Sequence, residues 1–382
     1  MLLDDDSCYD AIKACDPRFD GRFFVAVSST RIYCRPVCSA RTPKRQNCRF
    51  FPNAATAEAA GYRACLRCHP KLARATIRDD ATNYRSIRVT TRPPVPSNTS
   101  VFELSFRSPY DWNSLQAFLD ARAISGVEQI DGASYRRTVR VTRKGREHLG
   151  WIEVAPVKRA LRVVVSSSLM KVLPAVMKRV GHLMDVSSNP VEIADVLGAL
   201  AAPNPGLRVP GAFDGFEIGV RAILGQQVTV AAARTIAGRF AAAFGWQIDS
   251  PFATLTTVFP SPQQVAALTV DDIARLGVLA SRSRSILALS RALSDGAIDL
   301  DAGIDVAAEL EKLRALPGIG EWTAQYIAMR ALRWPDAFPH TDLGVKKALG
   351  ETDPRRVLEA GEAWRPWRSY AVMHLWQSLH QG

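Results

Sequence analysis

All seven cysteines of this 382-residue chain fall between Cys8 and Cys68. Four of them form two close pairs, Cys34 with Cys38 in a C-x3-C spacing and Cys65 with Cys68 in a C-x2-C spacing. Pairs at these spacings can close a tetrahedral four-thiolate zinc site. Four buried thiols without a metal are the alternative, but clustered cysteines in a reducing compartment favour a metal or a reactive thiol over disulfides. The sequence therefore predicts a compact, zinc-bound α+β domain over residues 1–75.

The chain is strongly basic, with a formal net charge of +12. Basic residues are concentrated near the cysteines, where Arg18 to Lys71 includes eleven of them against only Asp20 and Glu58. This balance indicates a polyanionic partner, most often nucleic acid. The acidic N-terminus (MLLDDDSCYD) lacks the apolar segment of a signal peptide, and no apolar run is long enough to span a membrane. We therefore expect a cytoplasmic protein without membrane contact.

Residues 316–342 combine a glycine-rich turn, an aromatic pair and a carboxylate. Residues 316–320 read LPGIG and lead into helix formers, so the turn can present backbone N–H groups to a phosphate at a helix N-terminus. Trp322 and Tyr326 are four residues apart and share one face of the predicted helix. Each feature has a structural alternative: the turn can be a helix connector, the aromatic residues can be core, and Asp342 can be a helix N-cap.

In this order and spacing, residues 316–342 resemble the helix-hairpin-helix superfamily of DNA glycosylases. The resemblance implies that Asp342 is the catalytic carboxylate, which stabilises positive charge on the sugar as the N-glycosidic bond breaks. It implies a phosphate grip formed by Gly318, Gly320 and Thr323, and a base pocket lined by Trp322, Tyr326 and Trp376. Aromatic faces in such a pocket attract cationic alkylated purines.

Other stretches are similar to the AlkA glycosylases within that superfamily, so this resemblance covers about residue 101 to the end. They are residues 109–112 (PYDW), 125–128 (SGVE), 206–211 (GLRVPG), 213–217 (FDGFE), 221–228 (RAILGQQV) and 364–376. The resemblance implies a mixed subdomain with an antiparallel sheet over residues 99–186 and an all-α domain over residues 187–382. It also implies that Gln227 fills the gap left by a flipped base; a helix-interior glutamine without a role is the alternative.

The cysteine region resembles the N-terminal zinc domain of the Ada family, through residues 19–23 (FDGRF), 33–38 (YCRPVC) and 65–68 (CLRC). The resemblance implies that all four paired cysteines bind zinc and that Cys34 accepts a methyl group from a DNA methylphosphotriester. Zinc keeps sulfur in its nucleophilic thiolate form. A structural zinc site with an unreactive Cys34 is the alternative.

The expected architecture is therefore a multidomain α+β chain. Residues 76–98 are predicted to be a linker because of their proline content, and they are too few to hold the AraC-type helix-turn-helix domain that follows the zinc domain in many Ada-like chains. The absence of that segment favours DNA repair over transcriptional regulation. An alkylation-sensing, DNA-binding regulator with structural zinc remains the alternative function.

The favoured function is that of a DNA-3-methyladenine glycosylase II. We expect it to act as a monomer on double-stranded DNA that contains alkylated bases or methylphosphotriesters, with 3-methyladenine and 7-methylguanine as released bases. Bifunctional relatives place a Schiff-base lysine where Trp322 stands, and an indole cannot form an imine. The resemblance therefore implies a monofunctional hydrolase.

Overall fold

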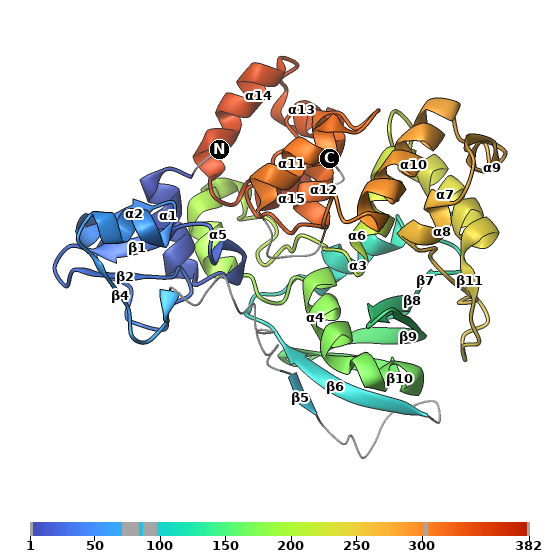
Figure 1. The fold of residues 1–382 in the computed structure, drawn as a ribbon, viewed down its shortest axis with the longest axis horizontal. Helices are drawn as coiled ribbons and strands as arrows, with labels where there is room; N and C mark the ends of the chain where they lie inside the picture. Colours follow the sequence, from blue (N-terminus) through green and yellow to red (C-terminus); the bar gives the residue numbers. More distant parts are fainter. Residues whose placement is uncertain (1–2, 71–83, 87–97, 301–304, 380–382) are drawn as a thin grey trace. The chain divides into compact units, whose positions relative to one another are not determined.

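The computed structural model describes residues 3–70, 84–86, 98–300 and 305–379. These residues fall into two compact units, and the chain passes repeatedly between them (Figure 1). The first unit takes its residues from 1–81, 187–206 and 334–382, and the second takes them from 82–186 and 207–333. The predicted all-α domain, residues 187–382, is therefore divided between the two units. Among the described residues, no helix has the length and apolar character needed to cross a membrane.

The N-terminal part of the first unit is a small sheet covered by short helices. Its strands run in the order β3-β1-β2-β4, where β1 is antiparallel to β2 and β3, and β2 is parallel to β4. Phe24, Tyr33 and Tyr62 form the centre of a core that consists of few residues. The elements are α1 (Asp5–Ala14), η1 (Pro17–Phe19), β1 (Phe24–Val27), β2 (Ile32–Cys34), η2 (Arg45–Asn47), β3 (Cys48–Phe51), α2 (Ala54–Ala59) and β4 (Arg63–Ala64).

The remainder of the first unit is helical. Helix α1 packs against α5, and α15 packs against α13. Local capping explains several helix starts, since Asp342 begins α13 and Asp353 begins α14 by accepting backbone N–H groups. The elements are α5 (Pro190–Leu197), η5 (Gly198–Leu200), α13 (Leu343–Leu349), α14 (Pro354–Gly361), η6 (Glu362–Trp364) and α15 (Arg368–Ser378).

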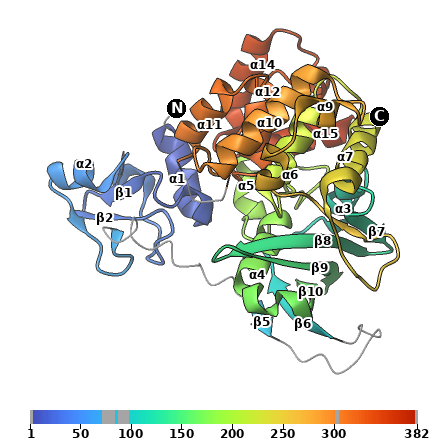
Figure 2. The same ribbon diagram turned by 45° about the vertical axis from the view of Figure 1, so that its right-hand side comes forward.

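An antiparallel sheet organises the first half of the second unit (Figure 2). Its strand order is β5-β6-β10-β9-β8-β7, and apolar residues of α3 and α4 join the strands in one core. Three residues of the predicted linker form the edge strand β5, which pairs with β6; the rest of that segment lies outside the described residues except Asn98. The elements are β5 (Tyr84–Ser86), β6 (Thr99–Ser105), α3 (Trp112–Asp120), β7 (Glu128–Asp131), β8 (Ser134–Arg143), β9 (Arg146–Val157), β10 (Ala160–Ser166), η4 (Ser167–Val172) and α4 (Leu173–Leu183).

Helix α6 (Gly215–Leu224) is the centre of the second half of this unit. It contacts α10 and α12, and at Gly219 an added Cβ would lie only 2.6 Å from the Leu289 side chain of α10, so a larger residue there would displace that side chain. This part is helical as expected, apart from the two-stranded pair β11–β12. The other elements are α7 (Val230–Phe244), β11 (Trp246–Gln247), β12 (Thr257–Val258), α8 (Pro262–Ala266), α9 (Val270–Ala274), α10 (Ala280–Ser294), α11 (Val306–Ala315) and α12 (Glu321–Arg330).

Buried ion pairs join the sheet to α6. Arg137 of β8 pairs with Glu217, and Arg221 pairs with Glu128 of β7 over 2.9 Å and with Glu217 over 3.0 Å. Burial alone would raise the pKa of Glu128, but the Arg221 and Arg137 guanidiniums outweigh it and hold that pKa below its ordinary value. Removing one member of this network would leave a buried charge without its partner.

Candidate functional site

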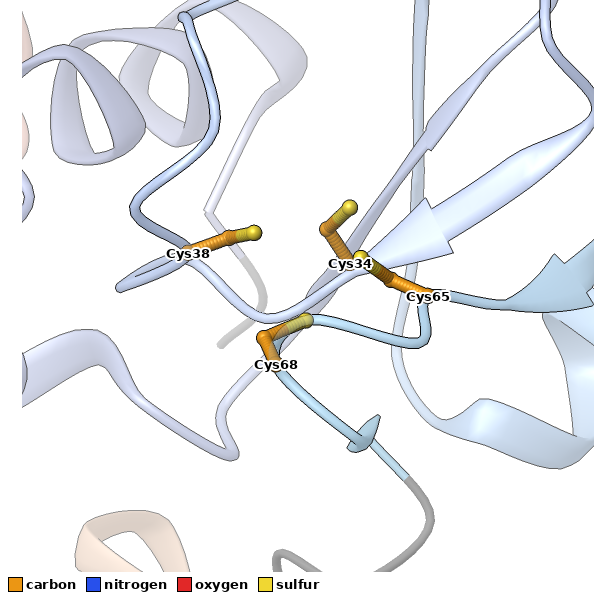
Figure 3. A group of neighbouring side chains, drawn as sticks. All are labelled: Cys34, Cys38, Cys65 and Cys68. Atoms are coloured by element: carbon orange, nitrogen blue, oxygen red, sulfur yellow. The ribbon is translucent and has the colours of Figure 1, made fainter.

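The paired cysteines converge in the small sheet domain (Figure 3). Cys34 ends β2, Cys38 lies in the following turn, and Cys65 and Cys68 follow β4. Their four sulfur atoms all lie within 4.8 Å of one another. Four thiolates at the usual Zn–S distance of about 2.3 Å lie roughly 3.8 Å apart in a tetrahedron. The donor set and its spacing therefore fit zinc.

Backbone N–H groups stabilise negative charge on this cluster. Arg35 N–H donates to the sulfur of Cys68 over 3.5 Å, and Arg67 N–H donates to that of Cys65 over 3.4 Å. A hydrogen bond from the Cys34 thiol lowers the pKa of Cys68 to about 5, and the same bond raises the pKa of Cys34. The two shifts are opposite because the two sulfur atoms share one proton, and the thiolate is favoured at Cys68 rather than at Cys34.

The basic residues around the cysteines divide into two groups. One group is engaged within the protein: Arg35 pairs with Asp20, and Arg18 pairs with buried Asp16. The second group is solvent-exposed and can meet a phosphate backbone. It comprises Arg31, Arg41, Lys44, Arg49, Arg63 and Arg67.

In the second unit, α11 and α12 form the predicted helical hairpin. Its turn is exposed at Gly318 and Gly320 and anchored by buried Ile319. Gly318 has a φ of +75°, which favours glycine, and an added Cβ would also displace the Ser285 hydroxyl, 2.1 Å away. Gly320 is the N-cap of α12 and supplies no side chain there, which suits a backbone anion site.

Gln226 joins this hairpin to the loop after α6, a role that the sequence did not reveal. Its side-chain amide donates to the Gly318 carbonyl over 2.9 Å and to the Thr323 hydroxyl over 3.0 Å. Thr323 is buried, so its side chain is committed to this contact. Gln226 thereby fixes the position of the turn.

Gln227 lies in the loop between α6 and α7. Its side chain is exposed and its φ is +55°, a left-handed conformation uncommon for a residue other than glycine. The alternative of a helix-interior glutamine is therefore wrong. Uncommon backbone conformations persist where the surrounding structure imposes them, often at ligand contacts.

Trp322 and Tyr326 stack on the exposed side of α12. Their ring centroids are 5.3 Å apart with an interplanar angle of 20°, and both side chains are half-buried rather than core. The Tyr326 hydroxyl accepts a hydrogen bond from Arg330 over 2.7 Å. Burial would raise the pKa of Tyr326, but Arg330, Arg122 and Arg221 lower it overall. The pair is a rigid, electron-rich platform.

Asp342 lies in the first unit, where it caps α13. Its Oδ1 accepts the Val345 backbone N–H over 2.9 Å and the Trp376 indole N–H, also over 2.9 Å. The capping alternative is therefore correct, but the capping oxygen also bonds the indole of a predicted pocket residue. A Cβ at Gly344 would lie 2.9 Å from the Trp376 ring and 3.0 Å from Asp342 Oδ1, so glycine permits this approach. Sequence reasoning missed Gly344 because the ring that requires it comes from α15.

Comparisons with known proteins account for almost the whole chain. Three family models match in succession: the metal binding domain of Ada at residues 7–71, the AlkA N-terminal domain at residues 101–214, and the HhH-GPD superfamily base excision DNA repair protein at residues 220–355. A Mycobacterium tuberculosis H37Rv relative, named probable bifunctional transcriptional activator/DNA repair enzyme AlkA, is 33% identical over 99% of this chain and 97% of its own length. The chain belongs to the AlkA family.

Further relatives match the two halves separately. DNA-3-methyladenine glycosylase 2 of Escherichia coli is 35% identical over 72% of this chain and 96% of its own length. The E. coli bifunctional transcriptional activator/DNA repair enzyme Ada is 48% identical, over 19% of this chain and 21% of its own length. A 3-methyladenine DNA-glycosylase from Archaeoglobus fulgidus has the same fold, with a TM-score of 0.61 and 19% identity, over 72% of this chain and 97% of that one.

These matches confirm two predictions for this AlkA-family chain. The fold class is multidomain α+β, with a small N-terminal metal-binding domain and a helix-hairpin-helix domain. The cofactor is zinc, because the Ada-type match covers the four cysteines whose sulfurs converge. The roles of individual site residues stay predictions.

Proposed function

We propose that this protein repairs alkylated DNA as a monofunctional glycosylase, acting as a monomer on duplex DNA. The reaction is hydrolysis of the N-glycosidic bond of alkylated purines such as 3-methyladenine and 7-methylguanine. The observation that carries the proposal is the carboxylate of Asp342, whose orientation is fixed by Trp376 and Val345 in a chain of the AlkA family. A fixed carboxylate stabilises the positive charge that develops on the sugar and can orient the attacking water.

The second unit supplies the proposed DNA contacts. The exposed Gly318–Gly320 turn would bind a phosphate through backbone N–H groups at the start of α12, and Thr323 would support it from the first turn. Trp322 and Tyr326 would stack on the extruded base. Their attraction for a cationic purine is about 0.5–2 kcal/mol per ring, so the weakened glycosidic bond of the lesion supplies much of the selectivity.

Gln227 is proposed to fill the space vacated by the flipped base. Its exposed side chain and left-handed backbone project it from a loop whose neighbour, Gln226, is tied to the hairpin turn. Proteins that unstack duplex DNA commonly insert a side chain between bases. Gln227 supplies a polar version of that side chain.

The zinc domain is proposed to accept methyl groups from DNA methylphosphotriesters at Cys34. The Cys34 thiolate attacks the methyl carbon, a sulfur–carbon bond forms, the carbon–oxygen bond breaks, and the DNA phosphodiester departs with the electron pair. Zinc lowers the pKa of its sulfur ligands and so supplies the thiolate. Exposed arginines beside the cluster would hold the DNA backbone.

Repair is favoured over transcriptional regulation by an observation on the M. tuberculosis relative. Its alignment spans 489 positions, more than the 382 residues of this chain, so segments of that transcriptional activator have no counterpart here. A regulator would use the glycosylase half only to dock on DNA. It would then bind methylated DNA without releasing bases.

The deciding experiment compares wild type with Asp342→Asn for release of 3-methyladenine and 7-methylguanine from methylated duplex DNA. Asparagine caps helices as well as aspartate does, so α13 should remain intact while the charge is lost. We expect at least a roughly 100-fold loss of rate. Asp353→Asn is the matched control, because Asp353 caps α14 in the same unit and should leave the rate unchanged. A folded wild type that releases no base would support the regulator instead.

Two further measurements address the reaction subtype and the zinc domain. Borohydride trapping and strand-cleavage assays should show neither an imine nor β-elimination, because Trp322 has no amine. Mass spectrometry after incubation with methylphosphotriester DNA should place one methyl group on Cys34, while Cys48, a buried thiol outside the cluster, stays unmodified. An unmodified Cys34 in zinc-loaded protein would make the zinc site purely structural.

A further inference from the structure

Phe19 of the metal-binding domain is buried against aromatic residues from the C-terminal part of the chain. Its ring centroid lies 5.5 Å from that of Trp334 and 5.3 Å from that of Trp367, both in edge-to-face geometry. Phe19 and Trp367 both have a relative exposure of 0%. Both residues belong to the first unit, so one apolar cluster joins the two ends of the sequence.

Two arginines surround this aromatic contact. The Arg18 guanidinium lies 5.3 Å from the Tyr370 ring centroid and 5.9 Å from that of Trp367, and it pairs with the buried Asp16 carboxylate. The Arg22 guanidinium lies 4.7 Å from the Trp334 ring centroid. Cations over aromatic faces are attracted by the ring quadrupole, the more so when water is excluded. We call Phe19, Arg18 and Arg22 the anchor.

The anchor is connected to the metal cluster through one ion pair. Asp20 follows Phe19 directly and pairs with the Arg35 guanidinium through Nε–Oδ1 at 2.7 Å. Arg35 follows Cys34, and its backbone N–H donates to the sulfur of Cys68. The position of the anchor therefore depends on the loop that wraps the metal.

On the other side, the anchor is connected to the segment that carries Asp342. Ser369, at the start of α15, donates its hydroxyl to the Trp334 carbonyl over 2.8 Å. Asp336 is buried, and its carboxylate pairs with Arg368, the first residue of α15, over 2.7 Å. Helix α15 then carries Trp376, which donates to Asp342. A continuous series of packed and hydrogen-bonded groups thus runs from the cysteines to this carboxylate.

A second contact supports the same attachment. Helix α1 of the metal-binding domain packs against α5 (Figure 1). Lys13 of α1 pairs with Glu192 of α5 over 3.2 Å. Two contacts at different points of the domain restrict rotation about either one.

We propose that the zinc domain has a second function as a structural brace for the glycosylase half. Metal at the four cysteines holds the anchor in place, and the anchor stabilises residues 334–342 and α15. Loss of zinc should therefore loosen α15 although the metal lies in another domain. The proposal rests on zinc binding and on the anchor, and it does not depend on catalysis by Asp342.

The test is hydrogen exchange measured by mass spectrometry on the full chain, before and after zinc removal with a chelator. Exchange in residues 368–378 should become at least about tenfold faster without zinc, because local opening no longer has to break the anchor. Peptides from β8 and β9, in the second unit, should be unchanged and serve as the internal control. Unchanged exchange in α15, while the cysteine region exchanges freely, would overturn the proposal.

Variants separate the anchor from zinc binding itself. Arg22→Ala should reduce the zinc-dependent protection of α15, whereas Arg49→Ala, at an exposed arginine of the same domain, should not. Phe19→Ala should abolish that protection and lower the melting temperature by about 5 °C or more, and Phe19→Leu should restore part of it. Equal zinc-dependent protection in wild type and Arg22→Ala would count against the anchor. Asp342→Asn should retain the zinc-dependent protection of α15. A failure of the catalytic role proposed for Asp342 can therefore be distinguished from a failure of the structural brace.

Discussion

The indole N–H of Trp376 and the backbone N–H of Val345 both donate to Oδ1 of Asp342, each over 2.9 Å. Two donors on one oxygen fix the rotation of the carboxylate. Trp376 was predicted only to line the base pocket. The contact predicts a further role for Trp376, that of positioning the proposed catalytic carboxylate.

Trp376→Phe should slow base release about tenfold in single-turnover assays, because a hydrogen bond to a charged group contributes about 1.5 kcal/mol. The melting temperature should stay close to that of wild type, because phenylalanine retains most of the packing of the indole ring. Trp364→Phe is the control, since Trp364 is in the same unit and packs on Phe338. A slower rate together with a lowered melting temperature would indicate a merely structural role for Trp376.

Gly344→Ala should displace the Trp376 ring, because the added Cβ would lie 2.9 Å from that ring. Alanine is a better helix former than glycine, so α13 itself should not be weakened. We expect a loss of activity of similar size to that of Trp376→Phe, with a melting temperature close to wild type. Gly238→Ala in α7, where the nearest atom to an added Cβ is 3.5 Å away, should retain full activity. Full activity in Gly344→Ala would show that the ring can shift freely.

Gln226→Ala should loosen the hairpin turn, because it removes the donor to Gly318 and Thr323. We expect duplex affinity to fall about five- to tenfold, through the lost positioning and the buried Thr323 hydroxyl left without this donor. The dependence of affinity on salt should keep its wild-type slope, since no charge changes. Gln247→Ala, at an exposed residue of β11, is the control. A reduced salt slope in Gln226→Ala would contradict this account.

Acid should destabilise the second unit through Glu128. Arg221 and Arg137 hold the pKa of this buried carboxyl below its ordinary value of 4.5, although burial opposes them. A carboxyl with a lowered folded-state pKa contributes stability that is present above its unfolded pKa and lost as pH falls through the folded one. The melting temperature should therefore drop below about pH 4.5, more steeply in wild type than in Glu128→Gln.

Glu128→Gln should itself melt at a lower temperature near neutral pH, because Arg137 and Arg221 would lose a buried counter-charge. Glu311→Gln, at an exposed position on α11, should melt as wild type does at every pH. If the melting temperatures of wild type and Glu128→Gln fell in parallel as the pH was lowered, the loss of stability in acid would come from other carboxyl groups.

Short-range sequence patterns predicted the parts of the site that are built locally. The two cysteine pairs each lie within one turn, so their spacing alone indicated a metal site. The four-residue spacing of Trp322 and Tyr326 likewise predicted that they share one helix face, where the structure shows their rings stacked. The capping interpretation of Asp342 is confirmed, since its Oδ1 caps α13, whereas its catalytic role stays a prediction.

Long-range contacts account for what the sequence did not predict. Gln226 donates hydrogen bonds to Gly318 and Thr323, which lie more than 90 residues further along the chain. Gly344 is required by a ring from α15, and Phe19 is buried by Trp334 and Trp367. No local periodicity encodes such partners. The same reason explains why the helical region after residue 187, expected as one domain, contributes to both units.

The buried charges between the sheet and α6 also constrain how such a chain can be rearranged by recombination. Arg137 and Glu128 belong to the sheet, whereas Glu217 and Arg221 belong to α6. A chimera that joined this sheet to a relative's helices would bury two of these charges without their partners unless the relative carried the same residues. Where the relative lacks these residues, a functional exchange point cannot lie between the sheet and α6.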